Sequence, residues 1–220
     1  MKKLLAFLIV LLLLTCPAFA DDTPSPFDIA GLSGTDFIVS YAADNGQVLY
    51  FTSMHHHPAE LPQDINFDGI DDLVFLTATG DGNTYYTFFV NLNGKYEHVF
   101  LMGHENDAAC NFQLHPDQQL LSVSVSHGAA GALCEKMLFR WGGANLLPVR
   151  RMVSEEFTET THDEQTTTTV THHDQVHVSF CRFEESTFVG DVYANQNLSL
   201  YDITEETFEQ WDAILWQDLQ

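Results

Sequence analysis

The chain has 220 residues, and its 31 acidic and eight basic side chains give a formal net charge of −23 at pH 7. This charge speaks against a nucleic-acid partner, because phosphate binding requires the opposite sign. Basic proteins and divalent cations are the natural counterparts, and the field of the chain would speed the encounter with either. Acidity that serves solubility alone fits the same numbers.

Residues 1–20 have the pattern of a secretory signal peptide. Two lysines precede an apolar run over residues 4–14, and residues 18–20 read A-x-A, as at a cleavage site. A lipoprotein signal at Cys16 fits less well, because threonine directly precedes that cysteine. The apolar run is too short to span a bilayer. We therefore expect no membrane span, cleavage after Ala20, and a periplasmic or secreted chain with six basic residues against 31 acidic ones, a net charge of −25.

The exported chain is predicted to be all-β. After a flexible start at residues 21–26, β-rich or alternating runs are separated by turn signals at intervals of about 8–12 residues. The predicted strands are residues 37–41, 47–52, 73–79, 84–91, 96–101, 120–126, 135–141 and 166–180. This spacing favours one antiparallel β-sandwich or barrel-like domain over residues 21–200.

Residues 64–72 carry the spacing of a calcium loop. Counted from the first of them, oxygen-bearing side chains fall at positions 1, 3, 5 and 9, and Gly69 stands at position 6, where such a loop turns sharply. The ligands that this spacing predicts are the side chains of Asp64, Asn66, Asp68 and Asp72 and the main-chain carbonyl of Ile70. An acidic, solvated turn is the alternative, since Asp, Asn and Gly favour turns for local reasons.

The predicted loop departs from a complete EF-hand. Position 12 is Phe75 instead of a bidentate glutamate, and the residues after Asp72 have the composition of a strand. The sequence therefore predicts an EF-hand-like Ca²⁺ site on a β scaffold, with a modest dissociation constant on the order of 10⁻⁴ to 10⁻³ M. Such a site stiffens a fold more often than it senses a signal.

Cysteine and histidine suggest further chemistry. Three cysteines remain after export, and in an oxidising compartment we expect one disulfide, with Cys110 and Cys134 as the first choice and pairings with Cys181 left open. Histidines cluster at residues 55–57 and 172–177. Transition-metal binding at these clusters is one interpretation, and surface histidines in an acidic protein are the other.

Residues 201–220 are predicted to form a C-terminal amphipathic helix. Asp202 and Glu205 can form a capping box. Apolar residues then follow at helical spacing, at Phe208, Trp211, Ile214, Leu215 and Leu219. We expect this stripe to pack on the β domain as part of its core.

The order of these features resembles secreted bacterial proteins that carry one FG-GAP-like, EF-hand-like calcium loop on a β-sandwich. The resemblance covers roughly residues 60–152: the loop, the strands that follow it, and the small-residue loop at residues 126–131. Members of this group are similar to periplasmic inhibitors of animal-type lysozymes.

The resemblance implies a lysozyme inhibitor that acts by inserting a protruding loop into the enzyme's cleft. The matching residues are Ser126 and His127, which could bond carboxylates there, with Gly128 and Gly131 permitting a tight protrusion. A net charge of −25 would favour encounter with a basic lysozyme. A plain Gly-rich hairpin is the alternative for this loop, and a calcium-dependent adhesion or envelope-associated module is the alternative function.

We do not expect an enzyme. The sequence has no nucleophile elbow, no H-E-x-x-H metal motif and no Gly-rich phosphate loop. Its adjacent carboxylates, such as Glu155 and Glu156, give no indication of a glycosidase pair across a cleft. No catalytic residue is assigned.

Overall fold

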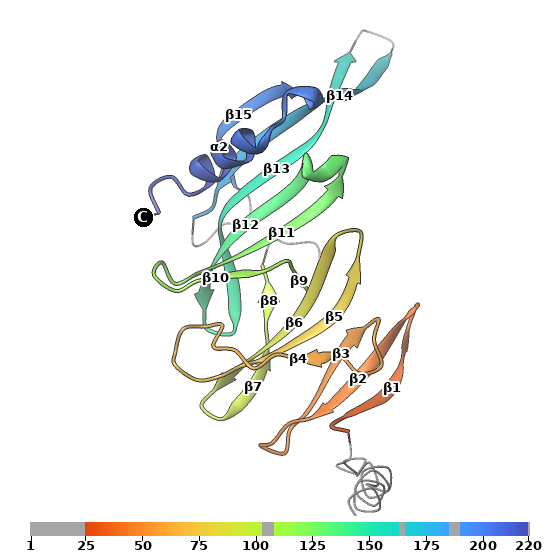
Figure 1. The fold of residues 1–220 in the computed structure, drawn as a ribbon, viewed down its shortest axis with the longest axis vertical. Coiled ribbons are helices and arrows are strands. Elements are labelled where there is room, and N and C mark those ends of the chain that lie inside the picture. The colour runs from red at the N-terminus through yellow and green to blue at the C-terminus, as the bar shows by residue number, and fades with distance from the viewer. Residues whose placement is uncertain (1–24, 103–107, 163–165, 185–189, 220) are drawn as a thin grey trace, which may run out of the picture.

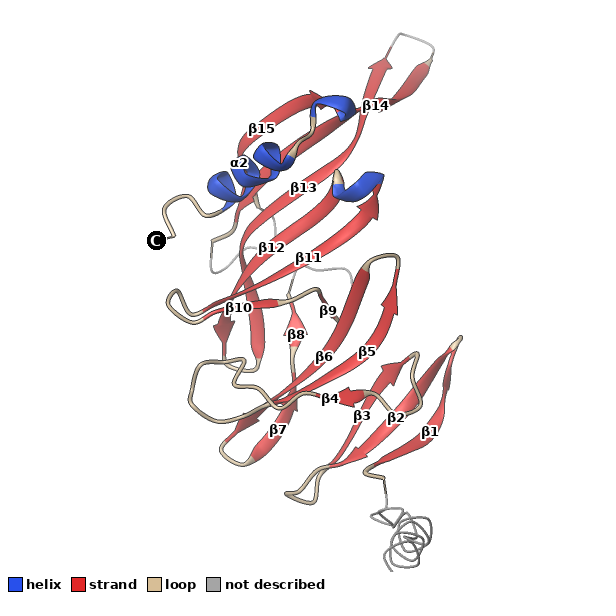
Figure 2. Cartoon of the chain, in the orientation of Figure 1, coloured by secondary structure: helices blue, strands red, loops and turns tan. Residues whose placement is uncertain are grey.

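The computed structural model describes residues 25–102, 108–162, 166–184 and 190–219. Antiparallel strands dominate these residues, and one α-helix lies near the C-terminus (Figure 1 and Figure 2). The predicted all-β fold with a short C-terminal helix is confirmed. No helix in the described part of the chain is long and apolar enough to cross a membrane. The predicted signal peptide lies outside the described residues.

The strands form three sheets, and apart from one short strand each sheet uses one continuous segment of the chain. The first sheet has the order β1 (Phe27–Ser33), β2 (Asp36–Ala42) and β3 (Val48–Ser53). The middle sheet has the order β4 (Ala59–Glu60), β5 (Leu73–Gly80), β6 (Asn83–Leu92) and β7 (Lys95–His98), and β9 (Ala109–Cys110) also pairs with β6.

The third sheet is the largest. Its order is β10 (Gln113–His115), β11 (Leu120–Gly128), β12 (Leu133–Gly142), β13 (Asn145–His162), β14 (Thr167–Arg182) and β15 (Asp191–Ser199). The short strand β8 (Phe100–Leu101) pairs in parallel with the start of β13. The remaining elements are the 3₁₀ turns η1 (Ala129–Gly131) and η2 (Leu200–Asp202) and the helix α2 (Glu205–Leu215).

The three sheets stack face to face in chain order, and α2 covers the outer face of the third sheet (Figure 1). The first core, between the first and middle sheets, contains Val39, Tyr41, Leu49, Phe51, Leu73, Phe75 and Phe89. The middle core, between the middle and third sheets, includes Val74, Phe88, Val90, Leu121, Val123, Met137 and Phe139. The third core, between the third sheet and α2, contains Leu138, Met152, Val176, Val178, Phe180, Trp211 and Leu215.

Stacking explains why some strands are apolar without alternation. Successive side chains of a strand point to opposite faces. In β5, Leu73 and Phe75 enter the first core and Val74 enters the middle core. In β12, Met137 enters the middle core and Leu138 the third. The middle and third sheets are therefore buried on both faces, which requires apolar residues at consecutive positions.

The C-terminal helix packs as predicted but begins differently. Trp211 and Leu215 are buried in the third core, and the rest of the predicted stripe packs around them. Asp202, however, belongs to η2, so the helix starts at Glu205. Its N-cap is Thr204, which forms the capping box with Thr207 in place of the predicted pair.

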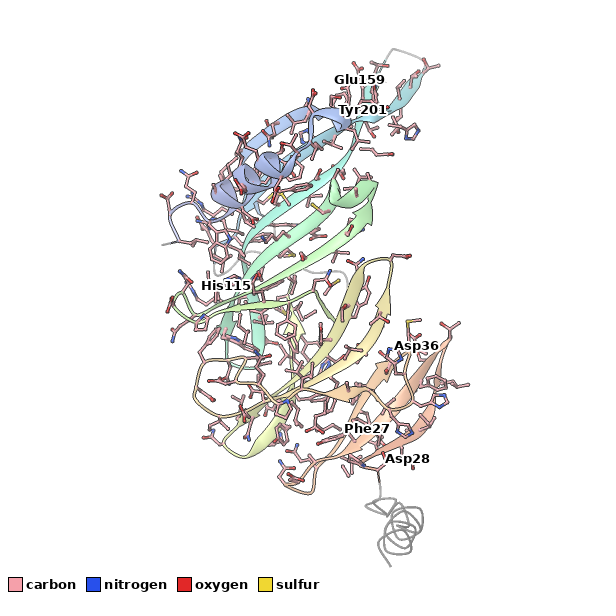
Figure 3. The ribbon with its side chains drawn as sticks, viewed as in Figure 1. Phe27, Asp28, Asp36, His115, Glu159 and Tyr201 are labelled. Atoms are coloured by element: carbon pink, nitrogen blue, oxygen red, sulfur yellow. The ribbon has the colours of Figure 1, made fainter. Side chains whose placement is uncertain are left out.

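The sequence did not predict β1, β13 or β15, nor the short strands β4, β9 and β10. Beyond Glu156, β13 and β14 continue as a two-stranded hairpin, because β12 pairs with β13 only as far as Ser154 and β15 pairs with β14 only from Gln175. This hairpin carries Glu159 and projects past the rest of the sheet (Figure 3). Residues 167–171 are exposed on this hairpin.

The predicted Cys110–Cys134 disulfide is not formed, since the structure holds Cys110, Cys134 and Cys181 as free thiols. Cys110 belongs to β9 in the middle sheet, whereas Cys134 packs against the third core on the opposite side of the third sheet. Burial raises the pKa of the Cys134 thiol to about 11, so this thiol stays protonated at neutral pH.

Candidate calcium loop and partner-binding turn

The predicted calcium loop joins β4 to β5 at the end of the middle core. Main-chain hydrogen bonds between Gln63 and Asp72 close the loop at its base. Inside it, the buried Ile65 belongs to the middle core, and its carbonyl accepts a hydrogen bond of 2.6 Å from the Trp141 indole on β12. The loop is thus attached to both the middle and the third sheet.

The first half of the loop folds around its own side-chain oxygens. The Asp64 carboxylate accepts hydrogen bonds from the N–H groups of Asp68, at 3.1 Å, and Gly69, at 2.9 Å. Asn66 Oδ1 also accepts from the Asp68 N–H at 3.0 Å, and Asp68 Oδ1 accepts from the Ile70 N–H at 2.9 Å. Gly69 has a φ of 86°, a conformation that favours glycine. The sharp turn predicted at this position is therefore present.

Asp72 differs from the other predicted ligands because it is buried, with 1% of its surface exposed. Its Oδ2 accepts a hydrogen bond from the Ile65 N–H at 3.0 Å, and its Oδ1 accepts one from the Asn91 N–H at 2.7 Å. Burial raises the pKa of the Asp72 carboxyl, and these two N–H groups oppose that rise. Asp72 thus holds the loop against β6.

Negative charge accumulates around the loop without a basic counterpart. None of the ion pairs of the described residues involves Asp64, Asp68, Asp71 or Asp72. A cavity of about 160 Å³ beside the loop is lined by several carboxylates: Asp44, Glu60, Asp71 and Asp72. Burial and these neighbouring carboxylates raise the pKa of Tyr96 in the same cavity. The potential at this end of the molecule therefore favours a cation.

The loop does not present a ready cluster of acidic ligands. Within the described ranges, no three His, Cys, Asp or Glu side chains are arranged to hold a metal ion. The structure brings Asp64, Asn66 and Asp68 into one turn, but it turns Asp72 toward main-chain N–H groups. The predicted calcium ligands remain a prediction.

The predicted partner-binding residues form the turn between β11 and β12. His127 and Gly128 are exposed at the end of β11, and η1 follows. Residues 128–131 all have positive φ, and two of them, Ala129 and Ala130, are not glycine. A left-handed conformation costs a non-glycine residue roughly 1–2 kcal/mol. The structure around the turn must therefore offset this cost.

Asn83, the first residue of β6, holds the base of this connection. It is 5% exposed, and its side-chain amide donates to the Ser126 carbonyl and accepts from the Ser126 N–H, both at 2.9 Å. Asn111 supports it by donating to Asn83 Oδ1 at 3.0 Å and to the Ser124 carbonyl at 3.1 Å. The Asn83 amide thus forms hydrogen bonds with the main chain of β11 as a neighbouring strand would. A single sequence gives no signal for this role.

The two histidine clusters do not form a common site. The His56 ring packs edge-on against Phe37 at a centroid distance of 4.0 Å. His173 Nδ1 lies 3.0 Å from a carboxylate oxygen of Glu156, and His177 Nδ1 lies 2.6 Å from Asn197 Oδ1. His56, His173 and His177 thus contact different residues, and these contacts do not bring the two clusters together.

No protein-family model, curated protein or solved structure matches this chain. The resemblance to calcium-loop β-sandwich proteins therefore depends on the motifs of residues 60–152 alone and stays a prediction.

Proposed function

We propose that this protein is an exported protein-binding module whose fold is stabilised by one calcium ion at residues 64–72. The observation that carries this proposal is the loop's first turn, where the oxygens of Asp64, Asn66 and Asp68 are gathered on main-chain N–H groups without a basic side chain to balance them. Calcium takes six to eight oxygen ligands from carboxylates, amides and carbonyls, which is the donor set of this loop.

Five residues would hold the ion. They are Asp64, Asn66, Asp68 and Asp72 through their side chains and Ile70 through its carbonyl. The ion would supply positive charge where acidic side chains accumulate. Because Ile65 and Asp72 tie the loop to β12 and β6, ordering the loop would stabilise the contact between the middle and third sheets. This makes a structural role the best-supported one.

Thermal unfolding of the exported chain with calcium, magnesium or chelator tests the site. Binding to the folded state alone raises stability by about 1.4–2.7 kcal/mol when the ligand concentration is 10–100 times the dissociation constant. We expect a calcium-specific rise in this range at about 10 mM calcium, given an affinity typical of extracellular sites. Asp64→Asn and Asp68→Asn should abolish the rise.

Asp71→Asn is the matched control, because Asp71 is exposed in the same loop and stands at a non-ligand position. It removes the same charge and should leave the calcium response intact. If all three variants lost the calcium-dependent rise equally, the rise would come from general charge screening. If the wild type showed no rise with calcium, the loop would be an acidic turn without a site.

The partner that fits best is a basic protein, and we propose an animal-type lysozyme whose cleft receives the β11–β12 turn. Two features support it: the exposed His127 stands on a turn whose base is fixed by Asn83, and the exported chain carries a net charge of −25. A fixed base limits the entropy lost on binding, and opposite charge speeds association.

Lysozyme inhibition by wild type, His127→Ala and His173→Ala separates this function from its alternative. We expect His127→Ala to lose inhibition while unfolding at the wild-type temperature. His173 is another exposed histidine, on β14, and His173→Ala should inhibit normally. If wild type does not inhibit, the inhibitor assignment fails, and a calcium-dependent adhesion or envelope-associated module becomes the leading function.

A further inference from the structure

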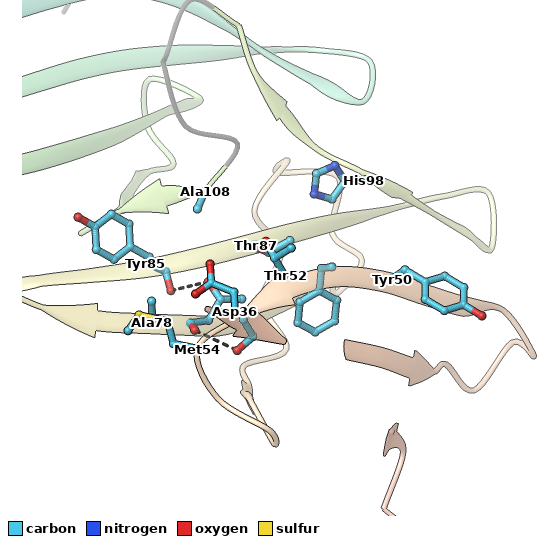
Figure 4. Close-up of a pocket in the computed structure, with 12 residues that line it drawn as sticks. Asp36, Tyr50, Thr52, Met54, Ala78, Tyr85, Thr87, His98 and Ala108 are labelled. Carbon is cyan, nitrogen blue, oxygen red and sulfur yellow. Dashed lines mark hydrogen bonds between the residues drawn. The ribbon is translucent and has the colours of Figure 1, made fainter. Parts of the chain in front are cut away.

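A cleft of about 600 Å³ opens between the first sheet and the middle sheet (Figure 4). Five consecutive residues of one segment, 50–54, line one wall. The face of a strand would contribute alternate residues only. The wall of the cleft is therefore the edge of β3, with its main chain exposed along the cleft.

The hydrogen-bond pattern of the β2–β3 hairpin shows which groups face the cleft. The Ala43 N–H donates to the Gln47 carbonyl, and from this pair onward every second residue of β3 is hydrogen-bonded to β2. These hydrogen-bonded residues are Leu49, Phe51 and Ser53. The N–H and C=O groups of Tyr50 and Thr52 must then point away from β2. Since β3 is the last strand of the first sheet, these groups form an open edge.

One end of this edge is closed. The β-bulge at Thr77 of β5 directs its carbonyl toward β3, where it accepts hydrogen bonds from the Met54 N–H at 2.8 Å and from Ser53 Oγ at 2.9 Å. These bonds fix the distance between β3 and the middle sheet. The cleft is thus held open by the fold itself.

The floor of the cleft belongs to the middle sheet. Thr87 lies directly opposite Phe75, a residue of the first core, and therefore on the same face of the sheet. Thr77, Tyr85 and Thr87 line the cleft from the middle sheet, and Figure 4 shows Tyr85 and Thr87 there. A fourth strand beside β3 would extend the first sheet over these residues.

We propose that this cleft binds an extended, positively charged peptide segment of a partner protein, which adds to β3 as a fourth strand of the first sheet. Main-chain pairing with Tyr50 and Thr52 supplies affinity, as in other complexes formed by strand addition. Among the described residues that line the cleft, Asp36 is acidic and none is a lysine or an arginine, and the exported chain would carry a net charge of −25. These charges select a basic segment. The site is separate from the β11–β12 turn.

The probe is a fluorescent heptapeptide, Lys-Thr-Val-Lys-Val-Thr-Lys, titrated against the exported chain at low salt. We expect it to bind at least tenfold more tightly than a version with glutamate in place of lysine. Because a strand pairs through alternate residues, two N-methylated forms should behave oppositely. Methylation of one alternate set should weaken binding at least tenfold, whereas methylation of the other set should change it less than twofold.

Two protein variants at Thr52 test the same edge. Thr52→Pro removes an N–H that faces the cleft, a change that edge strands tolerate, and should weaken binding at least tenfold. Thr52→Val keeps the main chain and should bind as wild type. If the proline variant fails to fold, the two methylated peptides still test strand pairing on the wild-type protein.

Four results would overturn the proposal. They are no binding of the lysine peptide at millimolar concentration, equal binding of the lysine and glutamate peptides, equal effects of the two methylation patterns, and self-association of the protein through this edge. Self-association would be seen by sedimentation of the wild type and lost in Thr52→Pro, and it would make a second copy of the chain the occupant.

Discussion

Asp72 shows how one residue links the loop to the pH response of the fold. Burial raises the pKa of this carboxyl, and the hydrogen bonds from Asn91 and Ile65 only oppose that rise. A raised pKa means that folding favours the protonated form. The contribution of Asp72 to the free energy of unfolding is therefore largest below the ordinary aspartate pKa and declines as pH rises through the pKa in the folded protein.

Unfolding of wild type and Asp72→Asn in chelator, across the acid to neutral range, measures this contribution. Asparagine does not titrate, so we expect the stability advantage of wild type over the variant to shrink as pH rises. Bound calcium favours the ionised carboxylate, so the decline should be smaller in millimolar calcium. An advantage that grows with pH in chelator would contradict the assigned direction, and Asp71→Asn controls for the loss of one charge in the same loop.

The helix α2 matters because it is the only layer that covers the third core among the described residues. Its largest buried side chain is Trp211, which is 1% exposed and packs edge-on against Phe208 at a centroid distance of 5.3 Å. The Trp211 indole N–H is buried without a hydrogen-bond partner. The contribution of this side chain is therefore its volume and apolar area.

Replacing Trp211 by alanine should lower the free energy of unfolding by about 3–5 kcal/mol, the usual cost of deleting a large buried side chain. Trp211→Phe should cost clearly less, because it keeps much of the packing and loses no hydrogen bond. Urea denaturation measures both. Glu209→Ala, on the exposed side of the same helix, is the control and should change the free energy of unfolding by no more than about 0.5 kcal/mol. An equally small change in Trp211→Ala would show that α2 is not docked on the sheet.

At the scale of the whole molecule, net charge opposes the stack of sheets. With 31 acidic residues against eight basic ones, self-repulsion destabilises the compact state. Salt shortens the range of that repulsion to about 8 Å at 0.15 M ionic strength. We therefore expect the melting temperature in chelator to rise between 10 and 150 mM sodium chloride, and a fall would show that attractive ion pairs dominate. Millimolar calcium should raise it further at constant ionic strength.

The sequence predicted those strands whose side chains give a clear pattern. The predicted strand at 84–91 corresponds to β6, and the one at 120–126 to β11, because both are rich in β-branched, aromatic or alternating residues. β13 was missed since it contains Pro148 and charged residues such as Arg151. In the fold, Arg151 is paired across the sheet with Glu135, with Nε and Oε1 2.8 Å apart. Such an ion pair depends on how the strands are aligned, and a single sequence does not reveal that alignment.

In the candidate site, too, local features could be predicted and long-range contacts could not. Local spacing predicted the turn at Gly69, and the hydrogen bonds of Asp64 that stabilise this turn are equally local, since they join residues four or five positions apart. The clamps from Asn91 to Asp72 and from Asn83 to Ser126 join residues 19 and 43 positions apart. The first arises only when β5 pairs with β6, and the second only when the middle and third sheets come together.

The order of the layers also sets an order of assembly. The first sheet uses residues 27–53 and the middle sheet residues 59–110, and the third, β8 aside, uses residues 113–199. A chain that emerges with its N-terminus first can therefore complete each sheet before the strands of the next sheet have emerged. At every stage the newest sheet presents an apolar face that only the following segment covers, and the last such face waits for residues 205–215. A stalled or truncated chain would expose that face, which makes it the part of this protein that holding chaperones would recognise.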